Sequence, residues 1–170
     1  LRRQRQMCIR DSITDERQIF KFNGFKQALQ HFQLPMYENS IVNTGGLDWY
    51  DGYTATNRLL LSSKRPTAII GASYDLTSGI IRSLRQNQLI IPKDMSVLSY
   101  DNIPQLSTLE IPVTSVGVPV DEIAKNIVYT LLSYIQNTEV VPQIEPLTPI
   151  INERVSCASN NKINYQAPST

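Results

Sequence analysis

The strongest constraint on the fold is a regular alternation of apolar strands with amphipathic helices. The segments RPTAIIGAS (65–73) and MSVLSY (95–100) are short apolar runs, and LTSGIIRSLRQNQ (76–88) between them repeats its apolar residues every four positions. A short run of this kind is typical of a strand buried on both faces, and the four-residue repeat is typical of a helix. This alternation predicts βαβ units, and therefore an α/β fold with a parallel, doubly wound sheet.

Further elements on both sides extend this pattern. The first helix is expected to begin at a Thr14 or Asp15 cap and to end before Pro35, and Asp121 is expected to cap the last helix. The additional predicted elements are helices at 14–32, 51–63 and 122–136, and strands at 40–46, 112–119 and 145–157.

Composition narrows the class of protein. With 170 residues the chain can bury a sizeable core, and its formal net charge of +1 gives no global attraction to nucleic acid or membrane. No apolar run approaches the roughly 18 residues of a membrane span. Cys8 and Cys157 stand alone, without a CxxC motif or a nearby histidine. We therefore expect no metal, no cofactor and a reducing, cytoplasmic environment.

The segment SVLSYDN (96–102) ends a predicted buried strand on a carboxylate, Asp101. In parallel α/β sheets, ligands bind beyond the carboxyl ends of the strands. Ser73 and Tyr74 follow the preceding strand, and the turn at 45–47 follows the first one, so these positions should share one edge. Asp101 either caps the next turn or faces a ligand, and we favour the ligand slightly.

The motifs of catalysis are not met. GASYD (71–75) has Asp75 where a nucleophile elbow requires glycine, and His31 is distant in sequence. No phosphate-binding glycine loop is present, and Asp101 has no clear acidic partner apart from Asp75 or Asp48. Asp75 is better explained as a cap or first-turn acid of its helix. We therefore expect a binding protein and not an enzyme.

A sugar or similar polyol suits this edge. A carboxylate can accept two hydroxyls, and charge-assisted hydrogen bonds are about twice as strong as neutral ones. Tyr74, Trp49, Tyr50 and Tyr100 could offer aromatic faces to the C–H surface of a sugar. For Trp49 and Tyr50, however, packing of the loop against the helix is the favoured interpretation.

Most of the chain resembles the effector-sensing core of the lactose/galactose-repressor (LacI/GalR) family of bacterial transcription regulators. The resemblance covers about residues 13–157, and several segments have the family's spacing. These segments are NGFKQAL (23–29), RPTAIIGASYDLTSGIIRSL (65–84), LIIPKDMSVLSYDNIPQ (89–105), VTSVGVPVDEIAKNIVYTLL (113–132) and LTPIINERVSC (147–157).

The resemblance implies two periplasmic-binding-protein-like α/β lobes with an effector in the cleft between them. It places Asp101 on the aspartate that hydrogen-bonds the effector, and Ser73 and Tyr74 on a polar pair lining the cleft. Lys21 falls where the family usually carries arginine, and a lysine cannot offer the same planar fork. Leu47 takes the position of a stacking aromatic, for which Trp49 is a possible substitute.

The resemblance also implies a division of the chain. Residues 13–117 and 151–157 would form the C-terminal lobe, residues 118–150 a fragment of the N-terminal lobe, and residues 158–170 a flexible tail. The segment MCIRD resembles translated adapter sequence, so we interpret residues 1–12 as a basic tail that is not native. Without the rest of its lobe, the helix face of Ile123, Ile127, Leu131 and Ile135 should be exposed and should drive association.

The function implied by the resemblance is sensing a small molecule for a cytoplasmic repressor. A galactose-like or other hexose is the expected effector, with a purine as the alternative. Operator DNA would bind only through a helix-turn-helix headpiece that this chain lacks, and a homodimer would match a two-fold operator. The second hypothesis is an extracytoplasmic sugar-binding protein of a transporter, which would need a signal peptide.

Overall fold

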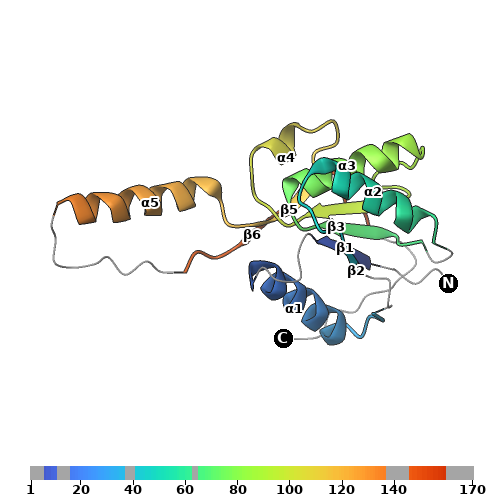
Figure 1. Ribbon diagram of the computed structural model, residues 1–170, viewed down its shortest axis with the longest axis horizontal. Coiled ribbons are helices and arrows are strands. Elements are labelled where there is room, and N and C mark those ends of the chain that lie inside the picture. Colours follow the sequence, from blue (N-terminus) through green and yellow to red (C-terminus); the bar gives the residue numbers. More distant parts are fainter. Residues whose placement is uncertain (1–5, 11–15, 37–40, 63–64, 137–145, 160–170) are drawn as a thin grey trace.

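The computed structural model describes residues 6–10, 16–36, 41–62, 65–136 and 146–159. They form one six-stranded sheet with the strand order β2-β1-β3-β4-β5-β6 (Figure 1). Strands β1 to β5 pair in parallel, and β6 runs antiparallel to β5. The strands are β1 (Gln6–Arg10), β2 (Ile41–Asn43), β3 (Ala68–Gly71), β4 (Ser96–Ser99), β5 (Thr114–Gly117) and β6 (Ile150–Asn152). The helices are α1 (Glu16–His31), α2 (Trp49–Leu60), α3 (Tyr74–Gln86), α4 (Gln105–Thr108) and α5 (Val120–Ile135). The predicted α/β fold with a doubly wound sheet is confirmed.

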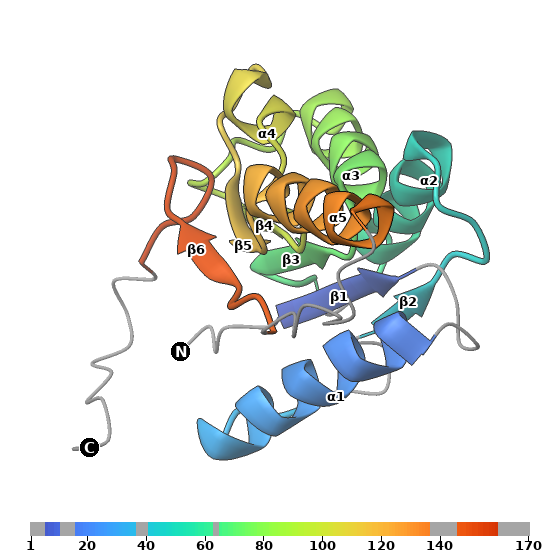
Figure 2. The same cartoon turned by 90° about the vertical axis from the view of Figure 1, so that its left-hand side faces the viewer.

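Helices α2 and α3 cover one face of the sheet, and α1 lies on the other (Figures 1 and 2). The four-residue repeat predicted for α3 makes its core face, because Leu76, Ile80 and Leu84 are all fully buried. They belong to the main hydrophobic cluster together with Ile69 of β3 and Val97 of β4. Burial of aliphatic side chains of this size contributes about 1.5–3 kcal/mol each.

The apolar runs of the central strands predicted burial on both faces, but in the structure the two faces are buried unequally. Residues of β3 and β4 alternate between buried and half-buried positions. Ile69 and Val97 are fully buried, whereas Ile70 and Leu98 are only half-buried. The half-buried residues point away from the main cluster, and alternate side chains of a strand always lie on opposite faces. The apolar composition is therefore compatible with one well-covered face and one partly covered face.

The prediction that residues 1–12 form a tail outside the fold is wrong for residues 6–10. This segment is β1, which lies between β2 and β3, with Cys8 opposite both Ile41 and Ile70. Backbone N–H and C=O groups inside a sheet need partners, and β1 supplies them to both neighbours. The sequence pattern did not predict β1 because the arginine-rich residues around it suggested a solvated chain end. Residues 1–5 and 11–12, the predicted caps Thr14 and Asp15, and residues 160–170 of the predicted tail lie outside the described residues.

Helix α5 projects away from the sheet (Figure 1). The predicted exposure of its apolar face is confirmed: Ile123, Ile127, Leu131 and Ile135 are 39%, 62%, 57% and 67% exposed. The predicted cap is wrong, because the N-cap residue is Pro119 and Asp121 lies in the first turn. Pro119 has no side-chain oxygen that could accept an N–H of the first turn, and accordingly no side-chain cap hydrogen bond forms at this helix start.

Strands β5 and β6 form the crossover, which we define as the two antiparallel strands that lead into and back from the α5 region. Their register places Val116 opposite Ile151. The segment after β6 is fastened to the sheet, since the Arg154 guanidinium donates to the Val113 carbonyl at 2.6 Å. The Ser156 hydroxyl accepts the Thr114 N–H at 2.7 Å and donates to the Val97 carbonyl at 2.6 Å. The segment after β6 is therefore held to β4 and to the start of β5.

Candidate functional site

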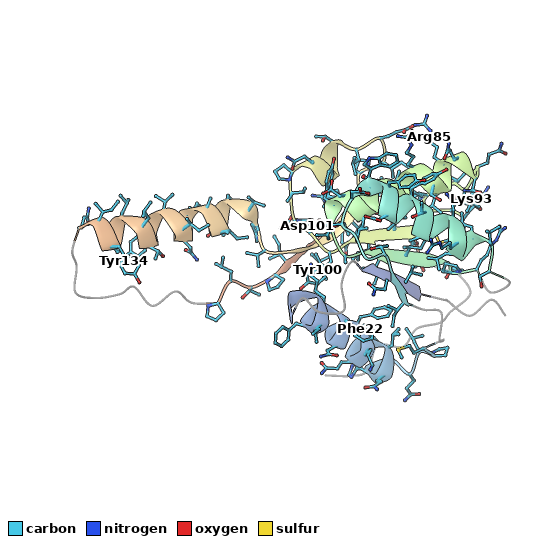
Figure 3. The ribbon with its side chains drawn as sticks, in the orientation of Figure 1. Phe22, Arg85, Lys93, Tyr100, Asp101 and Tyr134 are labelled. Carbon is cyan, nitrogen blue, oxygen red and sulfur yellow. The ribbon has the colours of Figure 1, made fainter. Side chains whose placement is uncertain are left out.

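Asp101 lies immediately beyond β4, at the same end of the sheet as the start of α5 (Figure 3). Its carboxylate oxygen Oδ2 accepts the backbone N–H of Tyr74 at 3.0 Å. Tyr74 is the first residue of α3, where N–H groups lack partners within the helix and a negative charge is favourable. Asp101 thus caps a neighbouring helix rather than its own following turn. Among the described residues, no hydrogen bond to its second oxygen, Oδ1, is found.

Ser73 precedes Tyr74 and caps the body of α3 beside this carboxylate. It is the N-cap residue of the helix, and its hydroxyl accepts the Leu76 N–H at 3.3 Å. Its carbonyl accepts the Thr77 hydroxyl at 2.7 Å, and the Thr77 and Ser99 hydroxyls lie 2.9 Å apart in the core. Within the part of the chain that the structure describes, no acceptor for the Ser73 hydroxyl proton is found. The preference of serine for caps therefore explains why a polar group stands at this edge.

Lys21 reaches the same edge from α1, on the opposite face of the sheet. Its ammonium group donates to the Ala72 carbonyl at 3.1 Å and lies 4.5 Å from the centre of the Tyr100 ring. A cation held over an aromatic face contributes about 0.5–1 kcal/mol at partly exposed sites. The structure thus brings Lys21, Tyr74 and Asp101 together around the ends of β3 and β4.

Leu47 and Trp49 lie in and after the loop that follows β2, with exposed fractions of 52% and 44%. The Arg82 guanidinium of α3 lies 4.8 Å from the centre of the Trp49 ring. This contact agrees with the favoured interpretation that Trp49 packs its loop against a helix. Within the described residues, no hydrogen bond or ring contact links Leu47 or Trp49 to Asp101. Their role in effector binding stays a prediction.

Asn102 and Asn152 are polar residues at this edge that the sequence analysis did not single out. The Asn102 amide donates to the Gly117 carbonyl at 3.3 Å, and its oxygen accepts from the Asn152 amide at 2.5 Å. The position of Asn102 directly after Asp101 was a usable signal. The pairing of Asn102 with Asn152 could not be predicted from the sequence, because the two residues are 50 positions apart and meet only through the antiparallel return of β6.

Two absences among the described residues bear on the kind of site. In these segments, no group of three or more His, Cys, Asp or Glu side chains could hold a metal ion. No helix formed by these segments is long and apolar enough to cross a membrane. His31, the only histidine of the sequence, is exposed at the end of α1.

Residues 6–157 match the family of periplasmic binding protein-like domains. The chain belongs to this family. Among curated relatives, this periplasmic binding protein-like domain is 31% identical over 134 residues to the HTH-type transcriptional repressor PurR of Vibrio cholerae, covering 79% of this chain and 40% of the relative. It is 28% identical over 149 residues to the ribose operon repressor of Escherichia coli, covering 88% of this chain and 45% of the relative.

A solved structure has the same fold. The domain superimposes on a LacI family transcriptional regulator from Enterococcus faecium with bound ribose at a TM-score of 0.79 and 26% identity, covering 91% of this chain and 57% of that one. The resemblance to LacI/GalR regulators that the sequence indicated is confirmed. The matches do not favour a binding protein of a transporter. The chain spans less than half the length of each of the two curated relatives.

Proposed function

We propose that this chain is the effector-sensing part of a cytoplasmic, non-enzymatic transcriptional repressor of the LacI/GalR type. The two relatives compared above are named as repressors, and their similarity covers most of this chain. The observation that carries the proposal is the contact between Asp101 and the start of α3 at 3.0 Å. It holds a carboxylate at the carboxyl edge of a parallel sheet, where ligands of such folds bind.

In this proposal, each polar group at the edge of the sheet contributes to effector binding. Asp101 Oδ1 accepts a hydroxyl of the effector while Oδ2 stays bonded to α3. The Ser73 hydroxyl donates, the Lys21 ammonium adds a positive charge, and the Tyr74 or Tyr100 ring packs on an apolar face of the ligand. Leu47 and Trp49 line the effector-binding site on the side of β2.

The effector class that fits best is a sugar, with a purine as the second class. Vicinal hydroxyls of a sugar can donate in pairs to a carboxylate, and such charge-assisted bonds are strong. One relative with this fold holds ribose, and another is the PurR repressor. The donors of a purine could also reach Asp101, so the choice between the two classes is left to the experiment.

The two-lobe arrangement belongs to the proposal. Residues 13–117 and 151–157, together with β1, form the C-terminal lobe, and residues 118–150 begin the N-terminal lobe beyond the crossover. The projection of α5 from the end of β5 supports this division (Figure 1). An effector bound between the lobes would favour one of their arrangements and so change operator affinity in a homodimer. DNA contact would come from a headpiece outside this chain.

The test is calorimetric titration of the natural protein that contains this segment with D-ribose, D-galactose and hypoxanthine. We expect one sugar to bind, and Asp101→Asn to weaken that binding about 10- to 100-fold, the effect of losing a hydrogen bond to a charged group. The matched control is Asp75→Asn, which removes the same charge from the exposed first turn of α3. Equal binding by both variants would refute the site, and binding of hypoxanthine alone would replace the sugar by a purine.

A further inference from the structure

The side chains of two consecutive residues after β4 form hydrogen bonds with different parts of the structure. Asp101 is bonded to Tyr74 of α3, whereas the side chain of Asn102 faces the crossover. The Asn102 amide nitrogen donates to the Gly117 carbonyl of β5, and its oxygen accepts from Asn152 of β6. One amide side chain therefore bridges both crossover strands, directly beside the proposed effector carboxylate.

Backbone packing reinforces this bridge at Gly117, which is buried. A Cβ atom at Gly117 would lie 3.0 Å from the Asn102 nitrogen and 3.2 Å from the Asp101 carbonyl carbon. The 101–102 peptide thus rests on the crossover at a distance that only glycine permits without a shift of a few tenths of an ångström. Because packed interiors transmit small displacements, β5 and this peptide cannot move independently.

We propose that Asn102 is a positioning residue that couples Asp101 to the crossover. The proposal rests on the function above in one respect, namely that the crossover leads to a second lobe. When β5 and β6 shift, the shared Asn102 amide and the Gly117 contact carry the 101–102 peptide with them, and the orientation of the Asp101 carboxylate changes. Because coupling is reciprocal, a ligand that fixes Asp101 favours one position of the crossover.

The coupling can be measured in the full 170-residue chain without a ligand. The readout is the hydrogen-exchange rate of the Tyr74 N–H, which is bonded to Asp101, divided by that of the Ile80 N–H in the middle of α3, both followed by NMR. Asn152→Ala removes the donor to Asn102, and Gly117→Ala adds a methyl group against the 101–102 peptide. In the structure, neither residue is bonded to Asp101 or Tyr74.

We expect this ratio to rise about fivefold or more in each variant, because local openings exchange independently of the core. The control is Asn87→Ala, which removes a 2.9 Å side-chain hydrogen bond to Asn57 near the other end of α3 and should leave the ratio unchanged. An unchanged ratio in Asn152→Ala overturns the proposal, and Gly117→Ala decides if Asn152→Ala does not fold.

The outcome is separable from that of the proposed function. A natural protein without affinity for sugars or purines would refute effector sensing but would leave the exchange ratio as measured. An unchanged ratio in a protein that binds a sugar through Asp101 would refute the coupling alone. A purely structural role for Asn102 would raise the exchange of Tyr74 and Ile80 together.

Discussion

The carboxylate of Asp101 holds the backbone N–H of Tyr74, although the two residues are 27 positions apart in the chain. The bond joins the end of β4 to the start of α3, which follows the neighbouring strand β3. A single acid thus stabilises a helix start and presents its second oxygen at the edge of the sheet. Its structural and its proposed binding roles can be separated by substitution.

Asp101→Ala should lower the free energy of unfolding by about 1 kcal/mol, because the Tyr74 N–H loses its acceptor at a helix start. Asp101→Asn should cost less, since the amide oxygen can still accept that N–H. Urea denaturation of the two variants and the parent chain measures the difference. Equal losses would show that the charge, and not the hydrogen bond, is what stabilises α3.

The chain alone should associate through α5, whose Ile127 and Leu131 are exposed on an apolar face. We expect sedimentation velocity to show a concentration-dependent increase in mass for the parent chain. The double substitution Ile127→Glu and Leu131→Glu should shift the population toward monomer. The control is Lys125→Glu, placed on the same helix, where Lys125 pairs with Glu122. A monodisperse, cooperatively unfolding parent monomer would contradict this prediction.

Two glycines on helices should respond oppositely to alanine. In Gly79→Ala the new Cβ would lie 1.8 Å from the Trp49 carbonyl oxygen, so α2 and α3 must separate, and we expect a loss of about 3 kcal/mol or more. Gly24→Ala on α1 meets no atom within 4 Å. Because alanine has the better helix propensity, we expect a gain of about 0.5–1 kcal/mol. Thermal unfolding of both variants measures these stability changes. A similar loss of stability in both variants would be evidence against the close contact between α2 and α3.

The Lys21 cation and the Tyr100 ring should be energetically coupled by about 0.5–1 kcal/mol. The measurement is a double-mutant cycle of Lys21→Met and Tyr100→Leu, with unfolding free energies from denaturant titration. The single Lys21→Met variant also loses the hydrogen bond to Ala72, which the cycle cancels. Additive losses would mean that the 4.5 Å approach contributes nothing.

Sequence patterns predicted the elements that local periodicity controls. Leu76, Ile80 and Leu84 repeat every four residues, and all three are fully buried on α3. Asp75 is a first-turn acid, as its position at the start of a helical pattern indicated. Parallel strands end at one edge, so the meeting of Tyr74 with Asp101 also followed from the predicted order of strands and helices. The role of Lys21 depended on the family resemblance.

Other features needed the tertiary structure. β1 is built from a segment whose composition suggested a tail, because its pairing is decided by two strands distant in sequence. Asp101 bonds to α3 rather than to its own turn because the two elements become neighbours only when the sheet forms. The bridge from Asn102 to Gly117 and Asn152 depends on the antiparallel return of β6.

The amino-acid sequence by itself thus determined most of the strands and helices, with β1 and α4 as the exceptions, because burial follows a local period of two or about 3.6 residues. It also determined that polar groups collect at one edge of the sheet. Only the tertiary structure decided which atoms those groups bond to, since hydrogen bonds depend on positions within a few tenths of an ångström that no local pattern encodes.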